Sequence, residues 1–380
     1  MADFVLVGKS RFVVIAVLQT IYSSRRAGCV VFGDEETRSF RWSTMCRRHV
    51  EIRFDGSDDQ RFLDCVNAMA AENPDLVLIP CDCDGIRLTD RVKHRLKVRT
   101  TPIPQAATLE MFDDKWRFYE FCRQHELPTP DTFFVGEKAA LDFDVIVSRL
   151  GLPFMLKPAN QAGSIGVQVV RSRQHFEEAI CRNPEYRFGR LIAQRYIDGV
   201  DIDLSLLAVQ GEVRAFAIQK NDGVEINFVP HAQLETLAAL VPRLSNYHGL
   251  MHIDARIDRK TGALYLIECN PRFWASLTEA AWCGLDFVQA TLQAERLANE
   301  KARVAGLTQG TAYTRHPLIR PASWPLLLAP GVRGRLMRAM MLDPYSVKTF
   351  LSLLPEIAWR YANKRAFSGV RRLRPRKAAL

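Results

Sequence analysis

Residues 252–274 constrain the fold more than any other part of this sequence. Polar and apolar residues alternate from His252 to Asp258, which is the period-two pattern of a strand with one buried face. A second, mostly apolar run extends from Ala263 to Cys269, and its alternation puts Leu264, Leu266, Glu268 and Asn270 on one side. Residues 259–262 separate the two runs and end in Thr-Gly, which is a turn signal. The stretch therefore predicts a β-hairpin.

Three oxygen-bearing side chains share the polar face of this hairpin. Folding at the Thr-Gly tip brings Asp254 opposite Glu268, with Asn270 one step further along the same side. Carboxylate and amide oxygens are the ligands that Mg²⁺ prefers. An exposed acidic hairpin would show the same alternation, but apolar residues flank Glu268 on both sides, and a buried carboxylate needs a partner. We therefore predict a metal site here, with Arg272 as a cation just beyond the oxygens.

The length of 380 residues is enough for two or three domains. Residues 1–105 alternate short apolar strands with helical segments, which predicts an α/β domain with a parallel sheet. The chain has no apolar run of eighteen residues, and its N-terminus is typical of a first strand and not of a signal peptide. Nine cysteines without regular spacing indicate free thiols in a reducing compartment. These features predict a cytoplasmic protein.

Two motifs in the first domain have both a functional and a structural interpretation. Gly8-Lys9-Ser10 follows a strand like the end of a phosphate loop, but it lacks the first glycine of that motif. Asp82 and Asp84 follow a strand end, where α/β folds gather ligands, although plain loop capping is the favoured interpretation. Cys81 and Cys83 lack the second ligand pair of a zinc site.

A strand at residues 153–157 carries Lys157 among apolar residues and leads into a loop of small residues. The backbone N–H groups of Gly163, Ser164 and Gly166 in this loop can approach phosphate oxygens closely. Further along, Lys220 ends another strand, where it either points into the same cleft or is an ordinary edge lysine. The loop is evidence for phosphate binding only together with the motifs that follow it in the sequence.

The candidate residues stand in a definite order along the chain: Lys115, Lys157 with its Gly-Ser loop, the segment Gln194–Ile197, Asp201, Asp254, Glu268, Asn270 and Arg272. Their order and spacing resemble the motifs of ATP-grasp enzymes, in the carbamoyl-phosphate-synthase-like and carboxylate–amine ligase branch. The resemblance covers residues 1–295 and implies an α/β and α+β fold. In that fold a Rossmann-like pre-ATP-grasp domain (1–105) precedes an ATP-grasp domain (106–302). The latter has a nucleotide-binding lobe at about 128–195 and a metal-binding, catalytic lobe at about 196–302.

The resemblance also implies roles for individual residues. Gln194 stands at the start of the adenine-reading hinge, where relatives often have Glu, and Asp201 stands where a commoner Glu bonds the ribose. The resemblance implies no role for His252 and Asp258, which are interpreted as bystanders. The ATP-binding residues implied are Lys115, Lys157, Gly163, Ser164, Gly166, Gln194, Arg195, Tyr196, Ile197 and Asp201; the metal ligands are Asp254, Glu268 and Asn270; the catalytic residues are Arg272 and Lys220.

The activity that the resemblance implies is ATP- and Mg²⁺-dependent ligation, with Mn²⁺ as a substitute metal. Transfer of the γ-phosphoryl group turns a carboxylate into an acyl phosphate, and an amine then attacks to give an amide, ADP and phosphate. One alternative is an enzyme forming carboxyphosphate or carbamoyl phosphate. A second is a non-catalytic ATP-binding protein at a membrane periphery. The partners expected are a small carboxylate and an amine, whose identities the sequence does not fix.

Residues 303–380 form a predicted helical, basic C-terminal extension. The chain carries a net charge of +10, and no acidic residue follows Glu356. Such an end can contact an anionic membrane surface. The alternative is that its apolar stripe packs on the core or forms a homodimer contact. Nucleic acid is not an expected partner, because no aromatic residues are interleaved with the basic ones in a binding motif.

Overall fold

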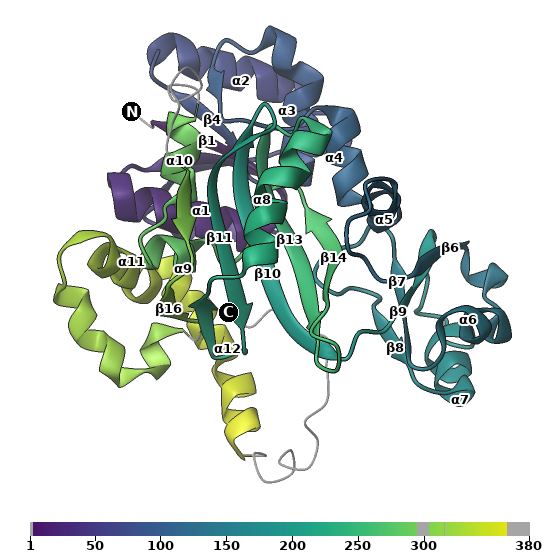
Figure 1. Ribbon diagram of the computed structural model, residues 1–380. Helices are drawn as coiled ribbons and strands as arrows, with labels where there is room; N and C mark the ends of the chain where they lie inside the picture. The colour runs from purple at the N-terminus through teal and green to yellow at the C-terminus, as the bar shows by residue number, and fades with distance from the viewer. Residues whose placement is uncertain (1–2, 295–303, 315, 363–380) are drawn as a thin grey trace.

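The computed structural model describes residues 3–294, 304–314 and 316–362, which build three β-sheets with helices packed on and between them (Figure 1). A five-stranded sheet lies in the N-terminal domain, a four-stranded sheet in a small lobe, and a seven-stranded sheet at the centre. The predicted α/β and α+β fold is confirmed.

The N-terminal sheet is parallel, with strand order β3-β2-β1-β4-β5. Its central strands are short and buried on both faces, as expected for a parallel sheet covered by helices on either side. The strands are β1 (Phe4–Val7), β2 (Cys29–Gly33), β3 (Cys46–Glu51), β4 (Val77–Pro80) and β5 (Arg99–Thr100), and the helices are α1 (Arg11–Arg25), α2 (Asp59–Glu72) and α3 (Cys83–Val92).

The carboxylate of Asp82 occupies the N-terminal ends of two helices in this domain. Its Oδ2 accepts hydrogen bonds from the backbone N–H groups of Lys9 (2.7 Å) and Ser10 (2.6 Å), and its Oδ1 accepts one from Gly85 (2.9 Å). A helix N-terminus favours a negative charge, and here the protein supplies its own. Gly8-Lys9-Ser10 is thus bound to a carboxylate of the chain, and the capping interpretation of Asp82 is confirmed.

The small lobe follows two connecting helices, α4 (Ala106–Asp113) and α5 (Lys115–Gln124). Its antiparallel sheet has the strand order β6-β9-β7-β8, and its own apolar core includes Ile146, Phe154 and Phe176. It lies in the region, at about 128–195, for which the sequence predicted a separate lobe. Its elements are β6 (Thr132–Gly136), α6 (Phe143–Leu150), β7 (Phe154–Pro158), β8 (Gln168–Val170), α7 (Arg173–Phe176), which continues as a π-helix at Glu177–Cys181, and β9 (Leu191–Arg195).

The central sheet has the order β14-β13-β10-β11-β12-β16, with β15 beside β11. Helix α8 (Ala232–Ser245) packs on one face, where Ile202, Leu204 and Ile253 are fully buried (Figure 1). The strands are β10 (Gly199–Val209), β11 (Glu212–Asn221), β12 (Glu225–Phe228), β13 (Gly249–Asp258), β14 (Leu264–Asn270), β15 (Ala305–Leu307) and β16 (Gly310–Tyr313).

Strands β15 and β16 lie beyond residue 302, where the sequence predicted only a helical extension. β15 pairs with β11 and β16 with β12, so residues 305–313 belong to the central sheet. Both strands are only three or four residues long and contain glycine, so they carry almost no period-two signal. The prediction of a purely helical extension was wrong for this segment.

The helices that follow pack against the first domain. α11 (Gly331–Leu342) lies on α1 and on α9 (Leu277–Trp282), which precedes α10 (Phe287–Gln293); α12 (Pro344–Ala362) begins beside residues 38–42. Tyr345 makes an edge contact with Phe40 at 4.9 Å between ring centroids. The basic residues 371–377 lie outside the described residues. Among the helices that are described, none combines the length and apolar character that a membrane span requires.

Candidate functional site

Four polar side chains form a row across the central sheet. The strand register pairs Gln219 with Asp203, Asp203 with Asp254, and Asp254 with Glu268. Residues paired directly across antiparallel strands point to the same face. All four therefore lie on the face opposite α8. The predicted pairing of Asp254 with Glu268 is confirmed.

A second row lies one step along the same face. It pairs Ser205 with His252 and His252 with Asn270. Asn270 lies at the end of β14, where its Oδ1 accepts a hydrogen bond from Nη2 of Arg272 at 2.9 Å. The predicted ligands Asp254, Glu268 and Asn270 thus occupy neighbouring positions on two adjacent strands. Two carboxylates and an amide oxygen in this arrangement fit a hard divalent cation such as Mg²⁺.

Asp203 and Asp254 lie side by side, and their pKa values move in opposite directions. Withdrawal from water raises the pKa of Asp203 to about 7, and the negative charge of Asp254 adds to the rise. Withdrawal from water acts on Asp254 too, but the hydrogen bond and charge of His252, together with Lys115, bring its pKa below the usual value. A cation near Asp254 would therefore meet a carboxylate that is already charged.

Lys115 connects this row of acids to the loop of the small lobe. The side chain is 7% exposed, and its Nζ lies 3.3 Å from Oε2 of Glu268. The same Nζ donates a hydrogen bond to the backbone carbonyl of Gln161 at 2.5 Å, and the backbone N–H of Lys115 donates to the carbonyl of Ala159. The position of Lys115 at the start of α5 thus brings a cation to the acids.

Lys157 lies on β7 and is 3% exposed. Burial lowers the pKa of its ammonium group to about 8, although the nearby charges of Glu268 and Asp254 act in the opposite direction. Lys115 contributes to the lowering, which shows that the two lysines are within electrostatic range of each other. The structure therefore brings both predicted nucleotide-binding lysines to the same group of acids.

The loop between β7 and β8 has left-handed backbone at all three predicted positions. Gly163, Ser164 and Gly166 have φ values of 67°, 62° and 73°. A side chain at Gly166 would collide with the ring of Phe188, 2.7 Å from an added Cβ, whereas Gly163 faces open space. Tyr186 also donates a hydrogen bond to the carbonyl of Gly166. Gly166 is therefore confined by packing, whereas a Cβ at Gly163 would have no neighbour within 4 Å.

The predicted hinge begins at the end of β9. Gln194 is 3% exposed, and its Nε2 donates to Oγ1 of Thr132 at 2.9 Å. Arg195 lies over the ring of Tyr265 at 5.0 Å. Tyr196 and the buried Ile197 follow the strand. The four hinge residues thus connect the small lobe to β10 of the central sheet.

Two predicted residues stand apart from the row of acids. Asp201 is exposed at the start of β10, where it forms an ion pair with Arg256 at 3.1 Å. Lys220 directly follows Gln219 on β11, so the alternation of side chains puts it on the opposite face. On that face, burial lowers the pKa of His231, and the charge of Lys220 lowers it further. The structure does not bring Lys220 to the acids.

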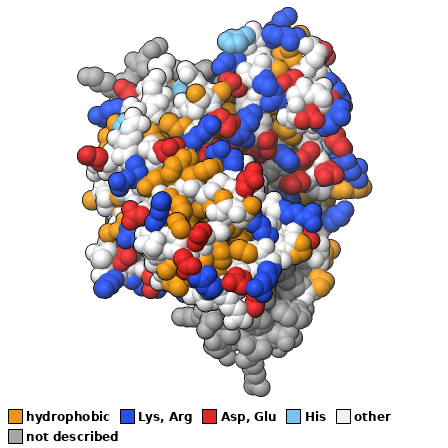
Figure 2. All heavy atoms as spheres, turned by 90° about the vertical axis from the view of Figure 1, so that its right-hand side faces the viewer, with side chains coloured by type: hydrophobic (Ala, Val, Ile, Leu, Met, Phe, Trp, Pro, Cys, Tyr) orange, Lys and Arg blue, Asp and Glu red, His pale blue; other side chains and the backbone are white. Residues whose placement is uncertain are grey.

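Arg272 lies between the central sheet and the N-terminal domain. Its Nη1 donates to the carbonyl of Phe273 at 2.7 Å, and its charge acts on Asp82 and Cys83 at the β4–α3 turn. The β4–α3 turn of the first domain therefore lies within electrostatic range of Arg272. Figure 2, which turns the right-hand side of Figure 1 toward the viewer, shows Lys and Arg side chains intermixed with Asp and Glu.

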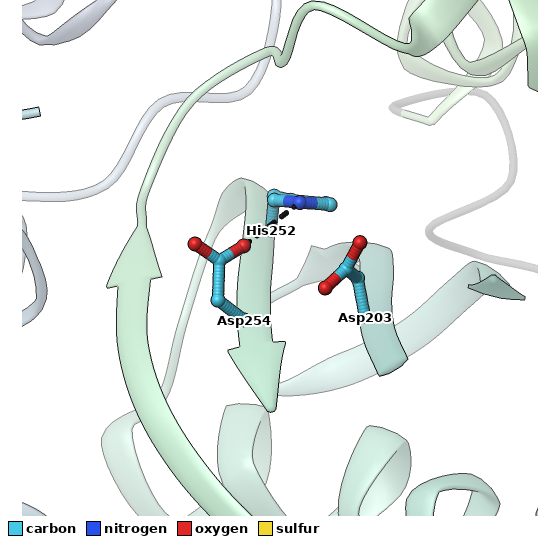
Figure 3. A group of neighbouring side chains, drawn as sticks. All are labelled: Asp203, His252 and Asp254. Atoms are coloured by element: carbon cyan, nitrogen blue, oxygen red, sulfur yellow. Dashed lines mark ion pairs between the residues drawn. The ribbon is translucent and has the colours of Figure 1, made fainter. Parts of the chain in front are cut away.

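Sequence reasoning missed three residues of this face. Asp203 faces Asp254 directly, and Gln219 donates to Asp203 Oδ2 at 3.3 Å and to Ser276 Oγ at 3.0 Å. His252, set aside as a bystander, contacts Asp254 (Figure 3). The alternation of Asp201, Asp203 and Ser205 is visible in the sequence and could have marked Asp203 as a member of the same face.

Comparison with known proteins finds one family model that matches the part of the chain with the row of acids and both lysines. The family model described as an ATP-grasp domain matches residues 112–276. A D-alanine–D-alanine ligase of Synechococcus sp. (strain JA-3-3Ab) is 24% identical over 242 residues, which cover 58% of this chain and 73% of the ligase.

Two solved structures share the fold. An N5-carboxyaminoimidazole synthase from Aspergillus clavatus, in complex with ADP and 5-aminoimidazole ribonucleotide, superposes with a TM-score of 0.61 at 15% identity and covers 87% of each chain. An L-amino acid ligase from Bacillus licheniformis has a TM-score of 0.54 at 18% identity, with 77% of this chain and 73% of that chain covered. At these sequence identities, the comparison shows a similarity of fold alone.

Proposed function

Residues 112–276 form an ATP-grasp domain, and on this premise we propose that the chain is an ATP- and Mg²⁺-dependent carboxylate–amine ligase. It activates a carboxylate as an acyl phosphate and joins it to an amine, with release of ADP and phosphate. The observation that carries the proposal is the group of Asp254, Glu268 and Asn270 on one sheet face, with Lys115 3.3 Å from Glu268. A site for binding alone does not need cation ligands and buried lysines together.

Different side chains would bind the cation and the phosphates during phosphoryl transfer. Asp254, Glu268 and Asn270 would hold Mg²⁺, which supplies positive charge between the phosphates when bound. Lys115 and Lys157 would add positive charge at the same place. An ammonium is a mobile point charge suited to phosphate oxygens.

The acyl phosphate would lie beside Arg272. The guanidinium donates to Asn270 and to a backbone carbonyl, so it is held in place before any substrate arrives. A preorganised cation stabilises negative charge that develops during the reaction. We propose that the acid and the amine bind between Arg272 and the β4–α3 turn, where Asp82 and Cys83 are within its electrostatic range.

The nucleotide would lie between the two lobes. The hinge at 194–197 would read the adenine edge, and Asp201 would exchange its ion pair with Arg256 for the ribose hydroxyls. The loop at 163–166 would close over the phosphates, since its Gly163 end has open space around it. Closure excludes the water that would otherwise hydrolyse an acyl phosphate. Lys220, on the far face, acts at most indirectly.

The deciding experiment is ADP release from Mg-ATP with panels of amino acids, other carboxylates and amines. We expect turnover that requires both an acid and an amine, and that Glu268→Ala abolishes. A bicarbonate arm without an organic acid tests the alternative, a carboxyphosphate-forming enzyme. Absence of turnover with every pair, together with unchanged ATP affinity in Glu268→Ala, would contradict the ligase proposal. Replacement of Mg²⁺ by Mn²⁺ tests the second metal.

We propose a cytoplasmic location, which suits the nine free cysteines of the described chain. Homodimer formation and peripheral membrane contact through the basic end remain proposals. Sedimentation equilibrium of the full chain tests the first. For the second, full-length protein and a form ending at residue 362 are sedimented with anionic vesicles. Equal partitioning of the two forms would contradict membrane contact through residues 363–380.

A further inference from the structure

We propose that His252 is a positioning residue, which holds the carboxylate of Asp254 in the orientation that binds the cation, and that Ser205 fixes the imidazole. The inference rests on the proposed function, because it assigns Asp254 to the metal. It adds two residues, His252 and Ser205, to a site that sequence reasoning built without them. Figure 3 shows the imidazole beside the Asp254 carboxylate, with Asp203 on the neighbouring strand.

The imidazole of His252 is held from three sides. Its Nε2 lies 3.1 Å from Oδ1 of Asp254, and its Nδ1 lies 2.8 Å from Oγ of Ser205. The ring stacks on the indole of Trp274, with 5.5 Å between centroids and an interplanar angle of 15°. His252 is 9% exposed and Ser205 is fully buried. A ring confined in this way can fix the side chain that it contacts.

In a neutral imidazole, the donors and acceptors of His252, Asp254 and Ser205 can be paired in only one way. A charged carboxylate only accepts hydrogen bonds, so Nε2 of His252 carries the proton that faces Asp254. In the neutral ring Nδ1 is then the acceptor, and the hydroxyl of Ser205 is a donor that meets it. Ser205 and His252 are paired directly between β10 and β13, so the sheet itself sets this contact.

The consequence concerns Oδ2, the second carboxylate oxygen of Asp254. With Oδ1 held by the imidazole, the side chain cannot rotate freely, and Oδ2 keeps a constant position relative to Glu268 on the next strand. Groups that orient metal ligands in this way change metal affinity by about 10- to 100-fold when they are removed. His252 should therefore affect cation binding more than nucleotide binding in the absence of the cation.

The experiment uses the full chain with four substitutions. His252→Ala removes the donor, His252→Gln keeps an N–H at a comparable distance from the backbone, and Ser205→Ala removes the group that fixes the ring. His316→Gln is the matched control, because His316 also stacks on an aromatic ring, that of Phe350 at 4.8 Å, but lies in the C-terminal segment. The dissociation constant of ADP is measured with and without MgCl₂. A titration then gives the MgCl₂ concentration at which half of the Mg²⁺-dependent increase in ADP affinity is reached.

We expect His252→Ala to raise this MgCl₂ concentration about 10- to 100-fold while the metal-free ADP affinity stays the same. His252→Gln should restore a large part of the difference, Ser205→Ala should cause a smaller rise, and His316→Gln should match the wild type. If His252→Ala does not fold, the Gln and Ser205→Ala variants provide the same comparison. A metal requirement unchanged in both His252 variants would overturn the inference.

A second measurement separates positioning from direct ligation. With Mn²⁺ as the probe, electron spin echo spectroscopy detects a directly bound imidazole nitrogen, and we expect no such coupling in the wild type. A coupling that disappears in His252→Ala would make His252 a ligand and overturn its positioning role. If wild-type protein shows no tightening of ADP by Mg²⁺, the proposed function fails first, and this outcome is distinct from the other two.

Discussion

Lys115 and Glu268 bring together the two parts of the site, with 3.3 Å between Nζ and Oε2. Lys115 begins α5 and Glu268 lies on β14 of the central sheet. Both side chains are largely withdrawn from water, at 7% and 19% exposure. A cation and a carboxylate that are so little hydrated each require the other, or a ligand that replaces it. ATP phosphates and a metal ion are the ligands that fit this description.

The first prediction follows from this pair. Lys115→Met removes the ammonium but keeps a long apolar stem, so phosphate oxygens lose a charged donor. We expect the dissociation constant of ATP to rise about 10- to 100-fold, the usual effect of losing a hydrogen bond to a charged group. Lys93→Met is the control, because Lys93 is exposed and pairs with Asp90 away from the site. Isothermal calorimetry of both variants measures the effect, and equal affinities would contradict this role of Lys115.

The second prediction concerns pH. The pKa of Lys157 is lowered to about 8, mainly by burial. Below this pH the ammonium is charged and ready for phosphate, whereas above it the free protein must take up a proton to bind. Linkage then requires ATP affinity to be nearly constant below pH 8 and to fall by up to about tenfold per pH unit above it. Titrations from pH 6.5 to 9.5 test this profile.

Lys157→Arg provides the matched test, since a guanidinium stays charged across this range. Its affinity profile should lose the change of slope near pH 8, even if its affinity at neutral pH is lower. A wild-type profile without a change of slope would show that Lys157 does not need its charge for ATP binding.

Local patterns predicted the part of the site that local geometry determines. Asp254 faces Glu268 within a hairpin of two strands that follow each other in the chain, with one shift of register between Asp254 and Ala255. The parallel N-terminal domain was predictable for a similar reason, since its buried strands are short apolar runs separated by helical segments. In both cases the signal lies within a few residues.

The contacts that the sequence did not predict depend on distant strands. Asp203 and His252 are separated by some fifty positions, and only the pairing of β10 with β13 places them on one face. The face on which Lys220 lies depends on its neighbour Gln219 turning toward Asp203, which no pattern in β11 alone reveals. Register between distant strands is set by the packing of the whole sheet.

The third prediction concerns the choice of base. Thr132 donates its hydroxyl hydrogen to the carbonyl of Pro130, so its oxygen accepts from Nε2 of Gln194. This fixes the Gln194 amide with its nitrogen toward Thr132. Its Oε1 is then the atom left to accept from the amino group of adenine.

Thr132→Val keeps the shape of the side chain but lets the amide turn. We expect the preference for ATP over GTP to fall about tenfold, the usual effect of one hydrogen bond. Thr89→Val is the control, because Thr89 is equally buried and bonds to a backbone carbonyl within α3. Competition binding of the two nucleotides measures the ratio. An unchanged preference in Thr132→Val would show that Gln194 does not read the base through this atom.

The fourth prediction concerns the C-terminal segment. Asp343, just before α12, is 4% exposed, and its Oδ1 accepts hydrogen bonds from the hydroxyl of Ser43 (3.1 Å) and from the backbone and hydroxyl of Thr44 (both 2.8 Å). These contacts fix α11 and α12 on the N-terminal domain. Asp343→Ala leaves three donors without their acceptor.

We expect Asp343→Ala to lower the free energy of unfolding by about 2 kcal/mol in urea titrations, because buried donors without a partner are costly. Asp343→Asn keeps the accepting oxygen and replaces Oδ2, an atom with no hydrogen-bond partner among the described residues. It should therefore retain most of the stability. Equal losses in the two variants would indicate that charge at position 343, and not the accepting oxygen, holds the C-terminal helices on the first domain.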